Sequence, residues 1–157
     1  MAGHFFVRYN GRVSDSLLIA AFALQHNPWR ARMTMTTATA VTGGAIIPFD
    51  TKTYDPAGMA TTGVGAKFTI LTDGYYMVES SVQNITTAVI LYVDIQQNSV
   101  VAGYGSSGGS SGTGELSQAA VVIKCVAGDV ITANVSATTT IQGAGVSHFS
   151  ITWIAPA

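Results

Sequence analysis

The three histidines are the side chains in this chain best suited to acid–base or metal chemistry, and their spacing supports neither. His4, His26 and His148 lie far apart, and none belongs to a metal-ligand pattern such as HExxH. No nucleophile elbow is indicated, although a Ser-His-Asp arrangement forms in space and does not depend on sequence order. We expect His148, on the polar side of the last strand, to be solvated or hydrogen-bonded. The sequence therefore predicts a non-enzymatic protein with no catalytic residue, no metal and no cofactor.

Cysteine and carboxylate residues indicate no site either. Cys125 is the single cysteine, and the apolar run around it predicts a buried, unreactive thiol. Asp50 and Asp55 flank a turn, where aspartate commonly bonds its own backbone. A calcium site needs several converging oxygen ligands, and the sequence does not place them. Asn84 and Asn134 begin glycosylation sequons, which matter only in a chain that a eukaryote secretes.

Charge is unevenly distributed along the chain. Residues 1–32 carry a net charge of +3, while residues 33–157 carry −4. The four arginines of the first part form no basic block and are not interleaved with stacking aromatics, so we expect no nucleic-acid partner. Residues 17–24 are apolar but far short of the roughly 20 residues that span a bilayer as a helix, so we expect no membrane partner. They match the core of a signal peptide only loosely.

Residues 1–31 are predicted to form an arm joined to the main domain. Residues 4–9 have the pattern of a hairpin strand that turns at Asn10-Gly11, and residues 14–16 resemble the N-cap of a short buried helix that ends by Asn27-Pro28. A terminal segment frays unless it is clamped, so we expect the arm to dock onto neighbouring subunits or onto an acidic scaffold. The attachment residues that we expect are Arg8, Arg12, Trp29 and Arg30.

From Arg32 to the end of the chain, apolar residues alternate with period two, which is typical of half-buried strands. Met33 and Met35 alternate with threonines, and Phe149 and Ile151 alternate with polar residues. No helix signal interrupts this pattern, and it predicts an all-β antiparallel sandwich over residues 32–157. Further strands are expected near residues 45–49, 65–71, 75–83, 88–96, 98–104, 117–126 and 130–136.

Four motifs resemble a known family in order and spacing. They are residues 46–50 (Ile-Ile-Pro-Phe-Asp), residues 54–56 (Tyr-Asp-Pro), Phe68 with Gly74 and Tyr76, and residues 127–130 (Ala-Gly-Asp-Val). Over about residues 32–157 the chain is thus similar to the globular head of complement component 1q, within the tumour necrosis factor-like jelly-roll superfamily. The resemblance implies a jelly roll of about ten strands that assembles as a three-fold symmetric homotrimer. Departures from the family pattern occur at Leu71, Val78 and Ile151.

Adjacent aromatic residues indicate that both faces of a strand are covered by apolar groups. Tyr75 and Tyr76 point to opposite faces, so one can pack in the core while the other faces a neighbouring subunit. Leu91, Tyr92 and Val93 repeat this arrangement. A monomer with a thick core is the alternative. The residues that we assign to the core or the trimer interface are Phe68, Tyr75, Tyr76, Tyr92, Phe149 and Trp153.

Residues 103–114 are almost entirely glycine and serine. They lack the Gly-Lys-Ser/Thr of a phosphate-binding loop, and a strand rather than a helix follows them. We expect either a permissive surface loop that joins two strands or a ligand-contacting tip. In the second case the ligand residues would be Tyr104, Ser107 and Ser110.

Two functions of different classes fit these expectations. The first is a structural protein of the virion, a trimeric bacteriophage capsid decoration, cement or fibre protein whose arm binds the major capsid protein or another virion scaffold. The basic arm, the lack of disulfides and the lack of a collagen-like stem favour it. The second is an extracellular recognition module that binds a host-surface receptor or a glycan through the loops at the outer end of the trimer.

Overall fold

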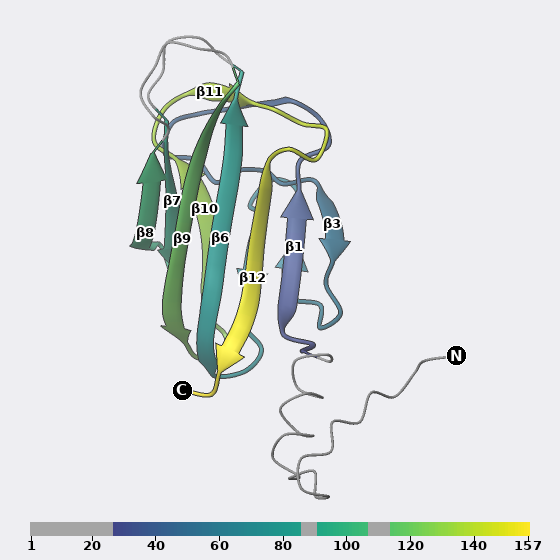
Figure 1. The fold of residues 1–157 in the computed structure, drawn as a ribbon, viewed down its shortest axis with the longest axis vertical. Helices are drawn as coiled ribbons and strands as arrows, with labels where there is room; N and C mark the ends of the chain where they lie inside the picture. Colours follow the sequence, from purple (N-terminus) through teal and green to yellow (C-terminus); the bar gives the residue numbers. More distant parts are fainter. Residues whose placement is uncertain (1–26, 86–90, 107–113) are drawn as a thin grey trace, which may run out of the picture.

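The computed structural model describes residues 27–85, 91–106 and 114–157. These residues form an antiparallel sandwich of twelve strands in two sheets, without a helix among them (Figure 1). The predicted all-β jelly roll is confirmed, with two short strands more than expected. The strands are β1 (Arg30–Thr34), β2 (Thr39–Val41), β3 (Thr51–Tyr54), β4 (Ala60–Thr61), β5 (Lys67–Thr69), β6 (Gly74–Asn84), β7 (Tyr92–Gln97), β8 (Val100–Ser106), β9 (Glu115–Cys125), β10 (Val130–Val135), β11 (Thr139–Ile141) and β12 (His148–Ala155).

The larger sheet has seven strands, in the order β2-β11-β6-β12-β1-β3, with β9 paired to the other edge of β6. Long ladders on both sides make β6 the centre of this sheet. It pairs with β9 from Gly74 opposite Cys125 to Asn84 opposite Glu115, and with β12 along most of the same length. Figure 1 shows β9, β6, β12 and β1 side by side across the molecule.

The second sheet has five strands, in the order β4-β5-β10-β7-β8. Its last strand, β8, closes against β9 of the larger sheet. A Cβ atom on Gly105 would lie only 1.5 Å from the carbonyl oxygen of Gln118, so a residue without a side chain is needed for the two backbones to approach this closely. The two sheets therefore meet along the β8–β9 side of the sandwich.

The core between the sheets is built around three phenylalanines. The ring centroids of Phe68 and Phe149 are 4.6 Å apart, and those of Phe49 and Phe149 are 5.7 Å apart. Tyr76 is also fully buried, and its hydroxyl donates a hydrogen bond of 2.8 Å to the carbonyl of Thr72. Phe68, Tyr76 and Phe149 are thus core residues of the sandwich. Trp153 is partly buried and packs against the core at its end.

One predicted strand has a different form. Residues 45–49 make a single bridge, between Ile46 and Asn134, and regular pairing begins only with β3. Pro48 has no N–H to donate, which interrupts a ladder at this point. Ile47 and Phe49 are nevertheless fully buried, so the segment lines the core as an irregular chain rather than as a strand.

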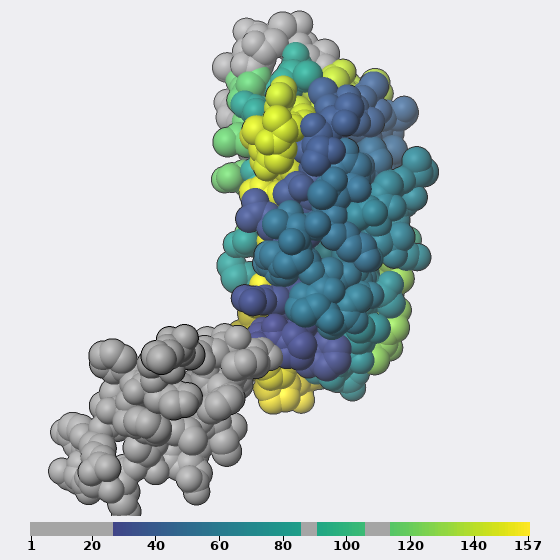
Figure 2. All heavy atoms as spheres, turned by 90° about the vertical axis from the view of Figure 1, so that its right-hand side faces the viewer, coloured from purple at the N-terminus to yellow at the C-terminus, as the bar shows by residue number. Residues whose placement is uncertain are grey.

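The first strand begins at Arg30, so two residues that we assigned to the arm belong to the sandwich. Figure 2 turns the β3 side of the molecule toward the viewer, and segments from the first part of the described chain form most of this narrow side. The expected hairpin and short helix of the arm lie outside the described residues. Within the described residues, no helix has the length and apolar character of a membrane span.

Candidate functional site

The candidate site is the front face, which we define as the surface of β9, β6, β12 and β1 that points away from the core. Alternation along β6 creates it. Tyr76 and Val78 are fully buried, whereas Tyr75 and Met77 are each 41% exposed. Met77 lies opposite Val122 of β9, which is 58% exposed. A contiguous row of large apolar side chains on a surface indicates a contact with another molecule.

The centre of the front face is polar. Arg32 of β1 lies opposite Ser150 of β12, and Ser150 lies opposite Glu79 of β6, so Arg32 and Glu79 stand in one row across three strands. His148 lies two residues from Ser150 on β12 and points to the same side. Three adjacent strands thus bring a cation, an anion and a titratable imidazole together on one face.

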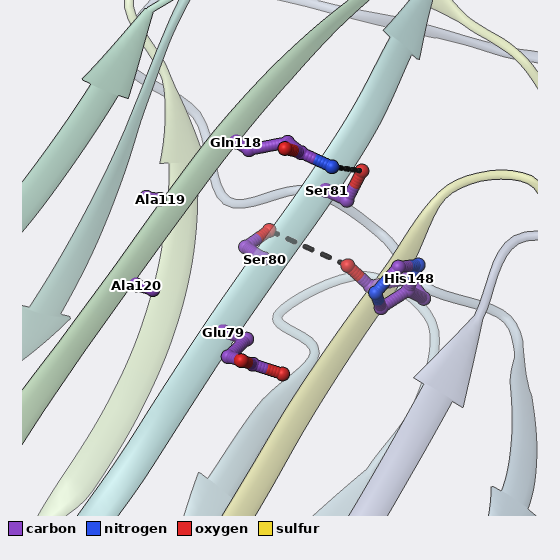
Figure 3. A pocket seen from close by; sticks show the side chains of 7 residues that line it. All are labelled: Glu79, Ser80, Ser81, Gln118, Ala119, Ala120 and His148. Atoms are coloured by element: carbon purple, nitrogen blue, oxygen red, sulfur yellow. Dashed lines mark hydrogen bonds between the residues drawn. The ribbon is translucent and has the colours of Figure 1, made fainter.

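Small side chains hollow the face beside these groups. Ala120 and Ser81 occupy positions where larger residues would fill the surface, and a shallow pocket of about 250 Å³ lies between β9, β6 and β12 (Figure 3). In the pocket, the Gln118 side-chain amide donates a hydrogen bond of 3.4 Å to Ser81 Oγ. The residues that line the pocket are Glu79, Ser80, Ser81, Gln118, Ala119, Ala120 and His148.

The surroundings of His148 favour its neutral form. Burial, and then the positive charge of Arg32, lower the pKa of His148 below 6.5. A hydrogen bond with the Val146 backbone and the negative charge of Glu79 act in the opposite direction, and they are the weaker influences. Ser80 Oγ contacts the backbone carbonyl of His148 at 3.5 Å, and in the described chain no hydrogen bond joins the imidazole to a serine hydroxyl. The pocket therefore lacks the serine–histidine contact of an activated nucleophile.

Arg32 and Glu79 form no ion pair within the described chain. The ion pair found among the described residues joins Lys52 and Asp55, with 3.3 Å between Nζ and Oδ2. The Nε atom of Arg32 is buried and donates no hydrogen bond to any residue that the structure describes. Leaving a buried donor unsatisfied costs about 1–3 kcal/mol, so this atom favours the arrival of an acceptor from outside the chain.

Two of the four expected attachment residues lie in the described part of the chain. Trp29 packs partly against the core, and its carbonyl accepts a hydrogen bond of 2.8 Å from the N–H of Trp153. The Arg30 guanidinium lies 5.4 Å from the ring centroid of Tyr54, which is a cation–π contact within the sandwich. Arg8 and Arg12 lie outside the described residues. The attachment role of all four stays a prediction.

The expected ligand residue Tyr104 lies on the outward side of the five-stranded sheet and is 75% exposed. It stands opposite Asp94 in the β7–β8 ladder, and Tyr92, two residues from Asp94, points to the same side and is also exposed. The structure therefore places Tyr92 near Tyr104 and away from the front face. Ser107 and Ser110 lie outside the described residues.

The other residues with reactive or metal-binding side chains lie in surroundings that indicate a structural role. Cys125 is buried, and burial, followed by the charge of Asp129, raises the pKa of its thiol to about 11. The Asp55 carboxylate accepts hydrogen bonds from the backbone N–H groups of Met59 (2.7 Å) and Ala60 (3.0 Å), as expected for a turn residue. No group of three or more His, Cys, Asp or Glu side chains in the described residues is placed to hold a metal ion.

Both glycosylation sequons begin with a buried asparagine. Asn84 is in β6 and Asn134 in β10, and each is less than a tenth exposed. The Asn134 amide donates a hydrogen bond of 3.2 Å to the carbonyl of Gly44. Their side chains are therefore not available at the surface for modification.

Sequence reasoning missed Arg32 and Glu79 as members of one site. Glu79 is the single charged residue of β6 and follows two exposed apolar residues at the same spacing of two. A charged residue in this alternating apolar series could have indicated the polar centre from the sequence. The pairing of β6 with β12 and of β12 with β1 joins residues far apart in the sequence and could not be predicted from it.

Comparison with known proteins shows the fold. No family model and no curated protein matches the chain. Among solved structures, the chain is similar to the TNF protein Eiger from S. frugiperda (TM-score 0.65, 14% identity, 82% of this chain and 93% of that one). It is equally similar to the globular domain of zebrafish complement 1qA (TM-score 0.65, 15% identity, 82% and 98%). Murine APRIL gives a TM-score of 0.64 at 9% identity, with 80% and 98% covered.

Proposed function

We propose that the chain is a non-enzymatic, homotrimeric recognition module that acts outside the cell by binding a receptor or a glycan. The observation that carries the proposal is the row of exposed apolar side chains on the front face, with Met77 opposite Val122. Burying apolar surface contributes about 25 cal/mol per Å², so second copies of the chain that cover this row stabilise an assembly. The likeness in fold to complement 1qA and to TNF proteins supports the same conclusion.

The complementary surface of the neighbouring copy is the β8–β9 side of the sandwich. Val100 and Val101 of β8, the edge strand of the five-stranded sheet, are both exposed. Contact between the front face of one copy and this side of the next is heterologous, and a heterologous contact that closes on itself gives a ring. Three copies in such a ring leave the outward side of each five-stranded sheet free to bind a ligand.

The ligand surface that we propose is centred on Tyr104. An exposed tyrosine offers a flat apolar ring with a polar tip, which suits the apolar face of a sugar. The Asp94 carboxylate opposite it supplies two acceptors for hydroxyl groups, and Tyr92 extends the surface. This composition favours a glycan over an anionic ligand, because Asp94 would repel an anion.

Two measurements test the proposed function. Sedimentation velocity should give a species of three chains at micromolar concentration, and a single chain at that concentration would contradict the trimer. A glycan array probed with the wild type should give hits that Tyr104→Ala abolishes. Val64→Ala is the matched control, because Val64 is a fully exposed loop residue between β4 and β5, and it should keep every hit. Array hits that persist in Tyr104→Ala would contradict the Tyr104 surface.

A virion-surface role is the second candidate, favoured by the net charge of +3 in residues 1–32. In this case the arm binds an acidic surface of the major capsid protein. Removing residues 1–26 tests this role and leaves Asn27, whose side-chain amide donates a hydrogen bond of 2.8 Å to the carbonyl of Trp153, in place. The truncated chain should keep its β-sheet circular dichroism but no longer band with virus particles on a density gradient. Unchanged banding would contradict the attachment role of the arm.

A further inference from the structure

The polar centre of the front face is charge-balanced as long as His148 is neutral. Arg32 contributes one positive and Glu79 one negative charge, and they stand in the same row of the sheet, separated by Ser150. Neither forms an ion pair within the described chain, and Arg32 Nε lacks a hydrogen-bond acceptor. Both groups are therefore free to interact with another copy of the chain.

Assembly through the front face changes the surroundings of these groups. Covering the apolar row at Met77 and Val122 also covers the adjacent polar centre and removes water from it. Charges that lose water are costly unless they are paired, so Arg32 and Glu79 must pair with each other or with polar groups of the second copy. One positive and one negative charge can pair in this way, whereas an additional positive charge has no partner.

We propose that His148 makes the trimer acid-labile, because one proton on each imidazole turns a balanced layer between the copies into a cationic one. The proposal rests on the proposed homotrimer. In each of the three contacts the protonated layer then carries one excess positive charge in a space with little water, where an unpaired charge is costly. Acid should therefore separate folded subunits from one another.

The charged groups around His148 support this assignment. β1 contributes Arg32, which opposes protonation, and β6 contributes Glu79, which favours it. Facing His148 directly are the uncharged residues Thr34 of β1 and Ser81 of β6. The other charged or titratable groups on these strands and their neighbours lie toward the strand ends or on the edge strand and its turns: Arg30, Asp50, Lys52, Tyr54, Asp55, Tyr75, Glu115 and Lys124.

The sign of the effect follows from the pKa of His148, which lies below 6.5 in the separate subunit. Dehydration beside Arg32 in the assembly lowers this pKa further. The separated subunits then bind more protons than the trimer does, so lowering the pH favours dissociation by linkage. Each trimer carries three such imidazoles, so we expect the dissociation constant to be higher at pH 5.5 than at pH 7.5.

Sedimentation equilibrium at pH 7.5 and pH 5.5, with circular dichroism at both, tests the proposal. The wild type should be trimeric at pH 7.5 and shift toward folded single chains at pH 5.5. His148→Gln should stay trimeric at both values, and His148→Asn provides a second neutral variant in case the first misfolds. The matched control is the double variant His4→Gln, His26→Gln, which keeps His148 and should lose its trimer in acid as the wild type does.

The outcomes separate this proposal from the proposed function. A wild-type trimer equally stable at both pH values, or a His148→Gln trimer that still dissociates in acid, would overturn the role of His148 and leave the homotrimer standing. Dissociation accompanied by loss of the β-sheet signal would also overturn it, because the subunits must stay folded. A single chain at both pH values would overturn the homotrimer and this proposal together.

Discussion

Met77 of β6 lies directly opposite Val122 of β9, and both side chains project from the sandwich into solvent rather than into its core. Their inward neighbours Tyr76, Val78 and Ile123 are buried. The central strand pair is thus apolar on both sides, whereas a sheet with one solvated face needs apolar residues on only one side. This relationship is the basis of the proposed assembly.

Replacing Met77 with arginine should break the assembly without unfolding the subunit. The residue lies outside the core, and moving a cation into a dehydrated contact is costly. Loss of a central contact residue typically costs about 2 kcal/mol or more, so we expect the dissociation constant to rise about 30-fold. Sedimentation equilibrium measures the change. Val64→Arg, on a fully exposed loop residue, is the matched control. Equal association of the two variants would contradict the role of the front face.

Adding a methyl group to Gly74 should destabilise the sandwich. A Cβ atom at this position would lie 2.2 Å from Trp153 Nε1 and 2.6 Å from the carbonyl oxygen of Ala155. Part of this neighbourhood is backbone, which cannot turn away, so Gly74→Ala should cost about 1–3 kcal/mol of unfolding free energy. Urea denaturation gives the value.

Gly58→Ala separates steric overlap from backbone conformation in this comparison. Gly58 has a φ of +74° but open space around the Cβ position, so its substitution should cost only about 1 kcal/mol. A Gly74→Ala variant as stable as the wild type would show that the end of the core at Trp153 repacks freely.

Asp50 should stabilise the fold above about pH 4 and lose this contribution in acid. Burial opposes ionisation, but hydrogen bonds from the backbone and hydroxyl of Thr36, from Thr51 and from the Thr37 backbone together lower the pKa of Asp50 below 3.8. The unfolded chain therefore binds a proton first as the pH falls, and the stabilisation is lost as the pH falls through the folded pKa.

Asp50→Asn is the corresponding variant. It removes the charge from these hydrogen bonds and should lower the unfolding free energy at pH 6 by about 1–2 kcal/mol. Chemical denaturation between pH 6 and pH 3 should show the wild type approaching the variant as acidity increases. Asp129→Asn should behave in the same way, because Asp129 also has a lowered pKa but lies at another turn. A constant difference between wild type and Asp50→Asn over this range would refute the prediction.

The Cys125 thiol should be unreactive in the native protein. It is fully buried, and its pKa is raised to about 11, so very little thiolate forms at pH 8. A chromogenic disulfide reagent should label the chain only slowly in buffer and within minutes in denaturant. Rapid labelling of the folded protein would show that the core opens near the β9 end.

The sequence predicts those parts of the fold that depend on local alternation. Tyr75 and Tyr76 follow one another in a strand, so opposite exposure is unavoidable, and the structure confirms it. Residues 45–49 were expected to form a strand because they are apolar, but Pro48 prevents a regular ladder and the chain instead continues irregularly along the core.

The polar centre of the front face depends on register, which the sequence does not encode locally. Arg32, Glu79 and His148 become neighbours only through two ladders that join distant segments, and a shift by one residue in either would turn their side chains apart. The same reasoning applies to Tyr104, whose nearness to Asp94 and Tyr92 follows from the β7–β8 register and its bulge rather than from the glycine-rich sequence itself.

The mass of the native protein in solution tests the central claim most directly. Sedimentation velocity at micromolar concentration and pH 7.5 should give one species of three times the chain mass of 16.2 kDa, and Met77→Arg should convert it to a folded single chain. A wild-type protein that sediments as one chain under these conditions, with Tyr75 and Met77 open to solvent, would contradict the account.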